Sequence, residues 1–169
     1  MFDFLIIETV GVGQSETFIK NLSDSVILGV QPGSGDSIQF MKSGIFEIPD
    51  IVVVTKCDIK NLSEITYSDL SGSKAYFQNQ NDWEIRIIKT SSAQNIGFDN
   101  LFDELNVRWK WLNDNKRLDK LRMKQDINWL YSCISKDFGD KGLERIKKNV
   151  SYKNSPFSKL KDLKSKFNF

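Results

Sequence analysis

Short apolar runs that alternate with helical patterns most constrain the fold of this chain. Four segments are predicted strands: Phe4 to Glu8, Val26 to Val30, Ile51 to Thr55 and Glu84 to Lys89. The first three are almost wholly apolar, which is typical of strands buried on both faces of a parallel sheet. Three segments between them are predicted helices: Ser15 to Asn21, Ser37 to Ile48 and Leu62 to Phe77. Alternating strands and helices imply right-handed crossovers and an α/β fold with a doubly wound, mostly parallel sheet.

Beyond Gly97 the pattern becomes entirely helical. Apolar residues between Phe98 and Leu112 recur at spacings of three and four, which predicts an amphipathic helix that closes the sheet domain. The remaining predicted helices cover 118–138, Gly142 to Val150 and Phe157 to Phe167, with a break at Pro156. We therefore expect a sheet domain over residues 1–113 and a helical arm over residues 114–169.

Charge is divided between the same two parts. Residues 1–113 carry a net charge of −6 and residues 114–169 carry +8, although the whole chain has only +2. Basic residues on solvent-exposed helices are the commonest explanation of such a basic C-terminal part. The alternatives are binding to RNA, to lipid, or to the acidic part of a second subunit. The tail lacks the interleaved aromatic and basic residues of RNA-binding modules, so a nucleic-acid partner is not expected.

Composition excludes several classes of protein. The chain has two distant cysteines, Cys57 and Cys133, and no histidine, which disfavours a zinc site or a disulfide framework. No apolar run approaches the roughly 20 residues that span a bilayer. The sequence after Met1 lacks the basic start and cleavage site of a signal peptide. These features predict a cytoplasmic protein without membrane association.

In a doubly wound sheet, ligands bind at the loops that follow the carboxyl ends of the strands. The loop Thr55-Lys56-Cys57-Asp58 follows a predicted buried strand. Asp58 could accept hydrogen bonds from the N1 and N2 protons of guanine, which adenine cannot supply. Lys56 would lay its stem along the base, and Thr55 would brace neighbouring loops. A surface turn is the alternative interpretation of these four residues alone.

A second loop supports the guanine interpretation. Thr90-Ser91-Ser92-Ala93 follows the next predicted strand, and small residues at Ser92 and Ala93 would let the backbone approach guanine O6. A serine-rich turn that caps the following helix is the alternative. Together the two loops indicate guanine binding.

The third motif is Glu8-Thr9-Val10-Gly11-Val12-Gly13-Gln14-Ser15-Glu16. An acidic residue at a strand end, Glu8, could hold Mg²⁺ through water, and Gly11 would let the backbone approach a γ-phosphate. A dinucleotide-binding fingerprint is excluded because Glu16 stands where the third glycine would be. A tight turn between strand and helix would also account for the glycines alone.

These motifs, together with Gln31-Pro32-Gly33-Ser34-Gly35-Asp36 and Asn154-Ser155-Pro156-Phe157, resemble those of the ArgK/MeaB family of P-loop GTPases. Members are also called LAO/AO transport system ATPases. They act as G-protein chaperones of methylmalonyl-CoA mutase, a cobalamin-dependent enzyme. The resemblance implies GTP or GDP and Mg²⁺ as cofactors, a mutase partner and homodimerisation through the helical arm.

The resemblance also implies roles for individual residues. Glu8, Gly11 and Gln14 match the catalytic switch, with Glu8 linked to the metal. Asp36, Gln39 and Lys42 match a further switch loop that passes the nucleotide state to the partner. Thr55, Lys56, Asp58, Ser92 and Ala93 match the guanine-binding loops. Thr55 replaces the asparagine that is usual in the family.

No G-x-x-x-x-G-K-[ST] motif occurs in these 169 residues. Without its amides and lysine the β- and γ-phosphates lack their main protein ligands. We therefore expect this chain to be a truncated form that does not hydrolyse GTP alone and that could be completed by a separately encoded P-loop half. A non-catalytic interaction module, or a remnant of gene decay, is the alternative.

Overall fold

The computed structural model of the chain describes residues 2–9, 16–33, 48–73, 82–147 and 155–166. It divides into two compact units, Met1–Asn115 and Lys116–Phe169.

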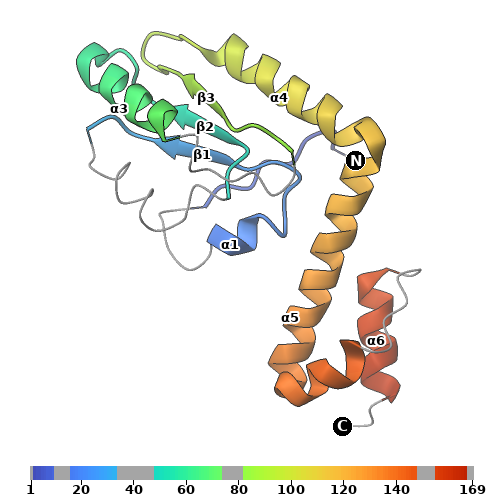
Figure 1. Cartoon of the computed structure of the whole chain (residues 1–169). Coiled ribbons are helices and arrows are strands. Elements are labelled where there is room, and N and C mark those ends of the chain that lie inside the picture. The colour runs from blue at the N-terminus through green and yellow to red at the C-terminus, as the bar shows by residue number, and fades with distance from the viewer. Residues whose placement is uncertain (1, 10–15, 34–47, 74–81, 148–154, 167–169) are drawn as a thin grey trace. The chain divides into compact units, whose positions relative to one another are not determined.

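The first unit contains a parallel three-stranded sheet (Figure 1). Its strands, in spatial and chain order, are β1 (Ile27–Val30), β2 (Ile51–Val54) and β3 (Arg86–Lys89). The strands are paired in register, so that Val30, Val54 and Lys89 lie side by side at the carboxyl edge. The parallel sheet and its helices confirm the predicted α/β class with doubly wound topology.

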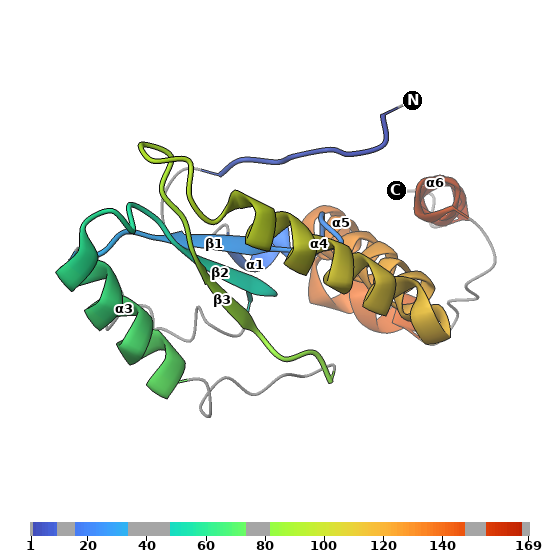
Figure 2. The same ribbon diagram turned by 90° about the horizontal axis from the view of Figure 1, so that it is seen from above.

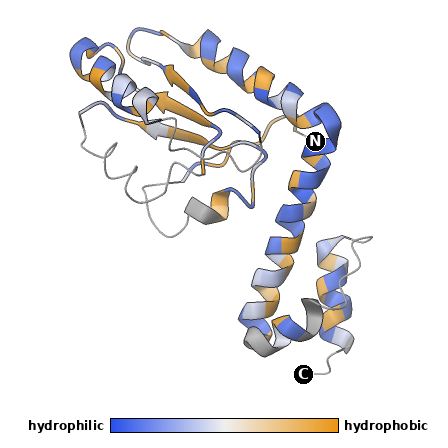
Figure 3. Cartoon of the chain, viewed as in Figure 1, coloured by the Kyte–Doolittle hydropathy of each residue, from blue (hydrophilic) through white to orange (hydrophobic). Residues whose placement is uncertain are grey.

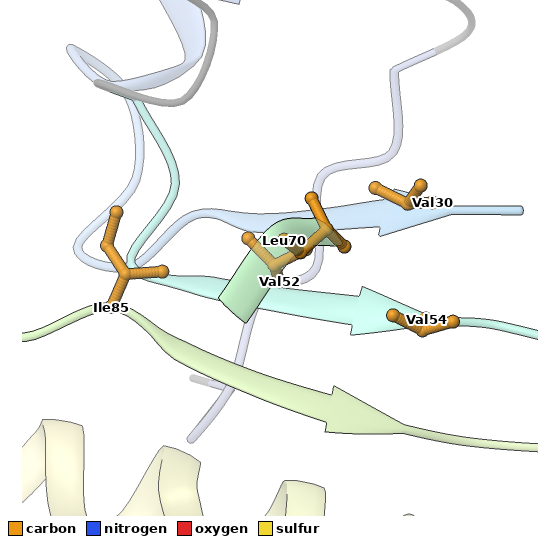
Figure 4. Packing of buried hydrophobic residues seen from close by; sticks show 5 residues of the cluster. All are labelled: Val30, Val52, Val54, Leu70 and Ile85. Carbon is orange, nitrogen blue, oxygen red and sulfur yellow. The ribbon is translucent and has the colours of Figure 1, made fainter. Parts of the chain in front are cut away.

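The two faces of the sheet are covered by different helices (Figure 2). Leu70 of α3 (Lys60–Gly72) packs with Val52 and Val54 on one face, as Figure 4 shows. Leu101 and Leu105 of α4 (Phe98–Asn113) pack on the opposite face against other strand residues: Ile51, Val53 and Ile88. Both helices cover β2, and the strands stand out as apolar segments in Figure 3. The predicted burial of this strand on both faces is therefore confirmed.

One predicted strand, Phe4 to Glu8, is wrong. Residues 2–9 are described but form no strand, and the side chains of Phe4 and Ile6 are 84% and 91% exposed. Apolar residues of high β-propensity do not by themselves make a strand, because the backbone needs a neighbouring strand to complete its hydrogen bonds. Among the described residues, none pairs with this segment.

The remaining predicted elements of this unit are confirmed where they are described. The other three strands lie within the predicted ranges, and the first helix is shortened to α1 (Glu16–Ile19). α3 begins two residues before the predicted Leu62 and ends at Gly72, where Ser73 is its C-cap, so the predicted end at Phe77 is wrong. The predicted helix Ser37 to Ile48 falls almost wholly outside the described residues.

The second unit is helical, as expected. After a short 3-10 turn, η3 (Asp114–Lys116), it contains α5 (Arg117–Lys147) and α6 (Pro156–Lys166). Gly139 interrupts α5 with φ 65° and ψ −171°, which marks the predicted separation into two helices. Leu130 and Ile134 form the centre of its core. No helix in the described ranges is long and apolar enough to cross a membrane.

Asp50 ties together the amino ends of all three strands. Its Oδ2 accepts a hydrogen bond from the amide of Val26, before β1, at 2.9 Å. Its carbonyl oxygen accepts one from Nε1 of Trp83, before β3, at 3.0 Å. Its Oδ1 lies 2.8 Å from Nη2 of Arg108 on α4. One residue therefore joins the sheet to the helix that covers it.

The charges of this ion pair are shielded from water. Arg108 is 4% exposed, and its guanidinium lies 4.8 Å from the ring of Trp83 and 4.6 Å from that of Trp111. Burial raises the pKa of Asp50 and lowers the pKa of Arg108, and in each case the partner's charge opposes the shift. Each charge is therefore tolerated in the interior because the other is present.

We predict that Asp50→Asn lowers the free energy of unfolding by about 3 kcal/mol, because it leaves the Arg108 charge buried without a counter-charge. Urea denaturation followed by circular dichroism measures this change. The matched control is Glu84→Gln, which removes the exposed partner of Arg86 and should cost less than about 1 kcal/mol. Equal losses in the two variants would contradict a special role for the buried pair.

Candidate functional site

The carboxyl ends of β2 and β3 bring two loops together. The amide of Thr90 donates to the carbonyl oxygen of Val54 at 2.9 Å, and the amide of Cys57 donates to that of Thr90 at 3.0 Å. These main-chain bonds extend the pairing of the strands into the loops. The predicted base-recognition loops, 55–58 and 90–93, are therefore neighbours.

A side-chain contact joins the loops directly. Oγ of Ser91 donates a hydrogen bond to Oδ1 of Asp58, and Ser91 Oγ also accepts one from the amide of Gln94 at 3.2 Å. Ser91 is fully buried, so its hydroxyl has a fixed environment. Within the described part of the chain, Asp58 has no second side-chain donor. Its carboxylate is therefore oriented but retains acceptor capacity.

The second loop folds back on itself. The amide and carbonyl groups of Ser91 and Ile96 exchange two hydrogen bonds of 3.0 Å. The reversal requires left-handed backbone at Asn95, with φ 53°, and at Gly97, with φ 81°. Ser92 and Ala93 are exposed at its tip. Over the described ranges, the Ala93 amide has no acceptor, so this donor is available to a ligand.

Thr55 and Lys56 connect the site to β1. The amide and the Oγ1 of Thr55 donate to the carbonyl oxygen of Val30 at 2.9 and 3.3 Å. Lys56 has left-handed backbone, with φ 51°, and its Nζ donates to Oε1 of Gln31 at 3.0 Å. Thr55 is thus hydrogen-bonded to the end of β1, and the Lys56 side chain is held toward Gln31, the residue that follows β1.

The other predicted site residues are not brought to this place by the described structure. Glu8 is exposed, and the strand that was expected to present it is not formed. Gly11 and Gln14 lie outside the described residues, as do three predicted coupling residues: Asp36, Gln39 and Lys42. Their roles remain predictions. Within the described ranges, no group of three or more cysteine, aspartate or glutamate side chains is placed to hold a metal ion.

Three residues have a place in the site that the sequence pattern did not assign. Ser91 fixes Asp58, Gln31 holds Lys56, and Gly97 permits the loop to return. For Ser91, the sequence signal for this contact was a hydroxyl group within a run of small residues. For Gln31 the sequence contained no such signal, because its contact with Lys56 joins residues 25 positions apart.

The donors and acceptors of the two loops are complementary in type to the hydrogen-bonding edge of guanine. A carboxylate accepts from the N1 and N2 protons, and a backbone amide donates to O6. Adenine presents an acceptor at N1 and a donor at N6, so it would face like groups at both positions. The site therefore has the chemistry to select guanine over adenine.

Comparisons with known proteins point in the same direction. The model of the family described as methylmalonyl Co-A mutase-associated GTPase MeaB matches residues 1–147. A mitochondrial methylmalonic aciduria type A homolog of Caenorhabditis elegans is 29% identical over 79% of this chain and 34% of its own length. A probable GTPase of Mycobacterium bovis is 30% identical over 88% of this chain and 44% of its own length. GTPase ArgK of Escherichia coli is 30% identical over 76% of this chain and 40% of its own length. The chain thus spans less than half the length of these relatives.

We predict that Gly97→Ala destabilises the first unit by about 1 to 3 kcal/mol, because a Cβ would collide with the carbonyl oxygen of Lys89 at a left-handed position. Gly72→Ala is the matched control, since a Cβ on that helical residue meets nothing within 4 Å. The control should be neutral or stabilising by up to about 1 kcal/mol. The urea denaturation midpoints of the two variants measure these changes. A Gly97→Ala variant as stable as Gly72→Ala would contradict the predicted clash.

Proposed function

The chain belongs to the MeaB family of methylmalonyl Co-A mutase-associated GTPases, and on this premise we propose that it binds guanine nucleotides through loops 55–58 and 90–97. The observation that carries the proposal is the hydrogen bond between Ser91 and Asp58. It joins the two loops that the sequence assigned to the base and orients the residue that would select guanine.

Asp58 would read the base. A carboxylate has about four acceptor positions, so Oδ1 can accept from Ser91 and still share the guanine protons with Oδ2. Hydrogen bonds to a charged group contribute about 1.5 to 3 kcal/mol each, so Asp58 would dominate the choice of base. The Ala93 amide would donate to O6, and the stem of Lys56 would cover one face of the ring.

We further propose that GTP hydrolysis by this family member depends on phosphate ligands from outside these 169 residues. The sequence contains no G-x-x-x-x-G-K-[ST] motif. Glu8 would bind Mg²⁺ through water, while Gly11 and Gln14 would lie beside the γ-phosphate. These groups alone offer too few ligands for the phosphates, so a P-loop segment would complete the site.

Exposed apolar surface supports completion by such a segment. β1 is an edge strand of the described sheet, and Ile27 on that strand is 44% exposed. The segment 2–7 exposes Phe2, Leu5 and Ile6 by more than 80%. Several large apolar side chains exposed along one segment are typical of an interaction site, and an open edge accepts a further strand.

The proposed cellular role is that of a G-protein chaperone for a cobalamin-dependent mutase. The names of the family and of the Caenorhabditis elegans relative support a link to methylmalonyl-CoA metabolism. Asp36, Gln39 and Lys42 would pass the nucleotide state to the mutase, and the helical arm 114–169 would form a homodimer in the cytoplasm. A second candidate is a non-catalytic interaction module, which the exposed apolar side chains of segment 2–7 would favour.

Asp58→Asn tests the choice of base. We predict about 100-fold weaker GDP binding, because two charge-assisted hydrogen bonds are lost. The same variant should gain affinity for xanthosine diphosphate, since the asparagine amide can donate to the carbonyl group at C2 of xanthine. Ligand-observed NMR titrations of both nucleotides measure the change. A variant that binds neither nucleotide differently from the wild type would contradict the proposed site.

Phosphate release from GTP tests the need for a P-loop. The chain alone should release phosphate at the rate of the buffer, because its phosphate cradle is missing. A second polypeptide that carries the P-loop half of a family member should co-purify with the chain. In an equimolar mixture of the two, the rate of phosphate release should rise. Hydrolysis by the chain alone that Asp58→Asn abolishes would refute the proposed dependence.

A further inference from the structure

Base recognition requires only the stem of Lys56, yet its charged end has a specific partner. Nζ donates to Oε1 of Gln31 at 3.0 Å, across the carboxyl ends of two adjacent strands. Both side chains are exposed, so the bond is not forced by burial. An exposed lysine normally samples many rotamers, so a fixed acceptor can decide where it lies.

Gln31 is mounted on rigid backbone. It follows Val30, which is 1% exposed and whose carbonyl oxygen receives both hydrogen bonds from Thr55. Pro32, which comes next, is buried and has a fixed φ. Gly33 has left-handed backbone, and a Cβ there would lie 3.1 Å from Cδ1 of Leu62 on α3. The backbone is therefore fixed on both sides of the acceptor.

Lys56 is constrained at its backbone but not along its side chain. Its carbonyl oxygen accepts the amide of Ile59 at 3.0 Å, and its φ of 51° is unusual for a residue with a Cβ. These features fix where the side chain starts. Four rotatable bonds follow, and among the described residues no carboxylate forms an ion pair with Nζ. Gln31 is the acceptor that fixes where the side chain ends.

We infer that Gln31 is a positioning residue of the guanine site, which holds the ammonium group of Lys56 so that its stem forms one wall of the base pocket. This inference rests on the proposed guanine binding. Preorganisation of this kind strengthens binding because the ordering of the lysine is completed before the ligand arrives. It also makes the affinity for the base depend on the loop after β1.

The test uses the full 169-residue chain and a ligand-observed NMR titration with GDP. Gln31→Leu keeps the size of the side chain but removes the acceptor, and it should weaken GDP binding about 3- to 10-fold. Gln31→Glu keeps an acceptor and should retain the wild-type affinity. Gln125→Leu makes the same chemical change on α5 and is the matched control, with GDP affinity unchanged. Circular dichroism melts confirm that each variant folds.

A double-mutant cycle with Lys56→Met separates positioning from a general structural effect. If Gln31 acts through Lys56, the double variant binds GDP no more weakly than Lys56→Met alone. In the ligand-free chain, Gln31→Leu should also increase the rate at which an acylating reagent modifies Lys56, measured by mass spectrometry.

The outcomes distinguish this inference from the proposed function. Saturable GDP binding by the wild type with equal or tighter binding by Gln31→Leu overturns the role of Gln31 and leaves the guanine site standing. A loss that persists in the Lys56→Met background also overturns it, because the effect then bypasses Lys56. No saturable GDP binding by the folded wild type overturns both.

Discussion

The complete burial of β2 is the constraint on which the first unit depends. Its four residues are between 0% and 6% exposed, because a strand lies on each side and a helix covers each face. A strand of Ile51 to Val54 can satisfy these demands only with apolar side chains at every position. The polar residues of the segment therefore begin where the burial ends, at Thr55, and the candidate site lies directly after the most deeply buried strand of the unit.

The two edges of the sheet have different roles. At the amino edge, Asp50 forms hydrogen bonds with the segments that precede β1 and β3. It also forms an ion pair with Arg108 of α4, whose guanidinium lies beside the rings of two tryptophans. At the carboxyl edge, left-handed backbone at Lys56 and Gly97 forms loops whose donors and acceptors remain partly unused. Left-handed backbone is costly outside glycine, so it persists where the surrounding structure fixes it.

The sequence predicted most of the first unit correctly, and its failure at Phe4 to Glu8 has a physical cause. This segment and Ile51 to Thr55 have similar apolar composition, yet only the second has neighbouring strands in the described structure. Side-chain composition shows what a segment would bury, whereas strand formation depends on backbone partners far away in the sequence. For the candidate site, the assignment of the two loops and Asp58 to guanine stays a prediction, and the sequence did not indicate the contacts through Ser91 and Gln31.

The sequence by itself determined the class of fold, the order of most elements, and the position of the two loops that we propose for guanine recognition. These features are local, since hydrophobic periodicity and residue type are read within a few positions. Only the tertiary structure decided that Ser91 fixes Asp58, that Gln31 holds Lys56, and that Asp50 pairs with Arg108. Each of these contacts joins residues at least 25 positions apart, so its geometry exists only after the parallel strands have set the register of the loops and helices that they connect.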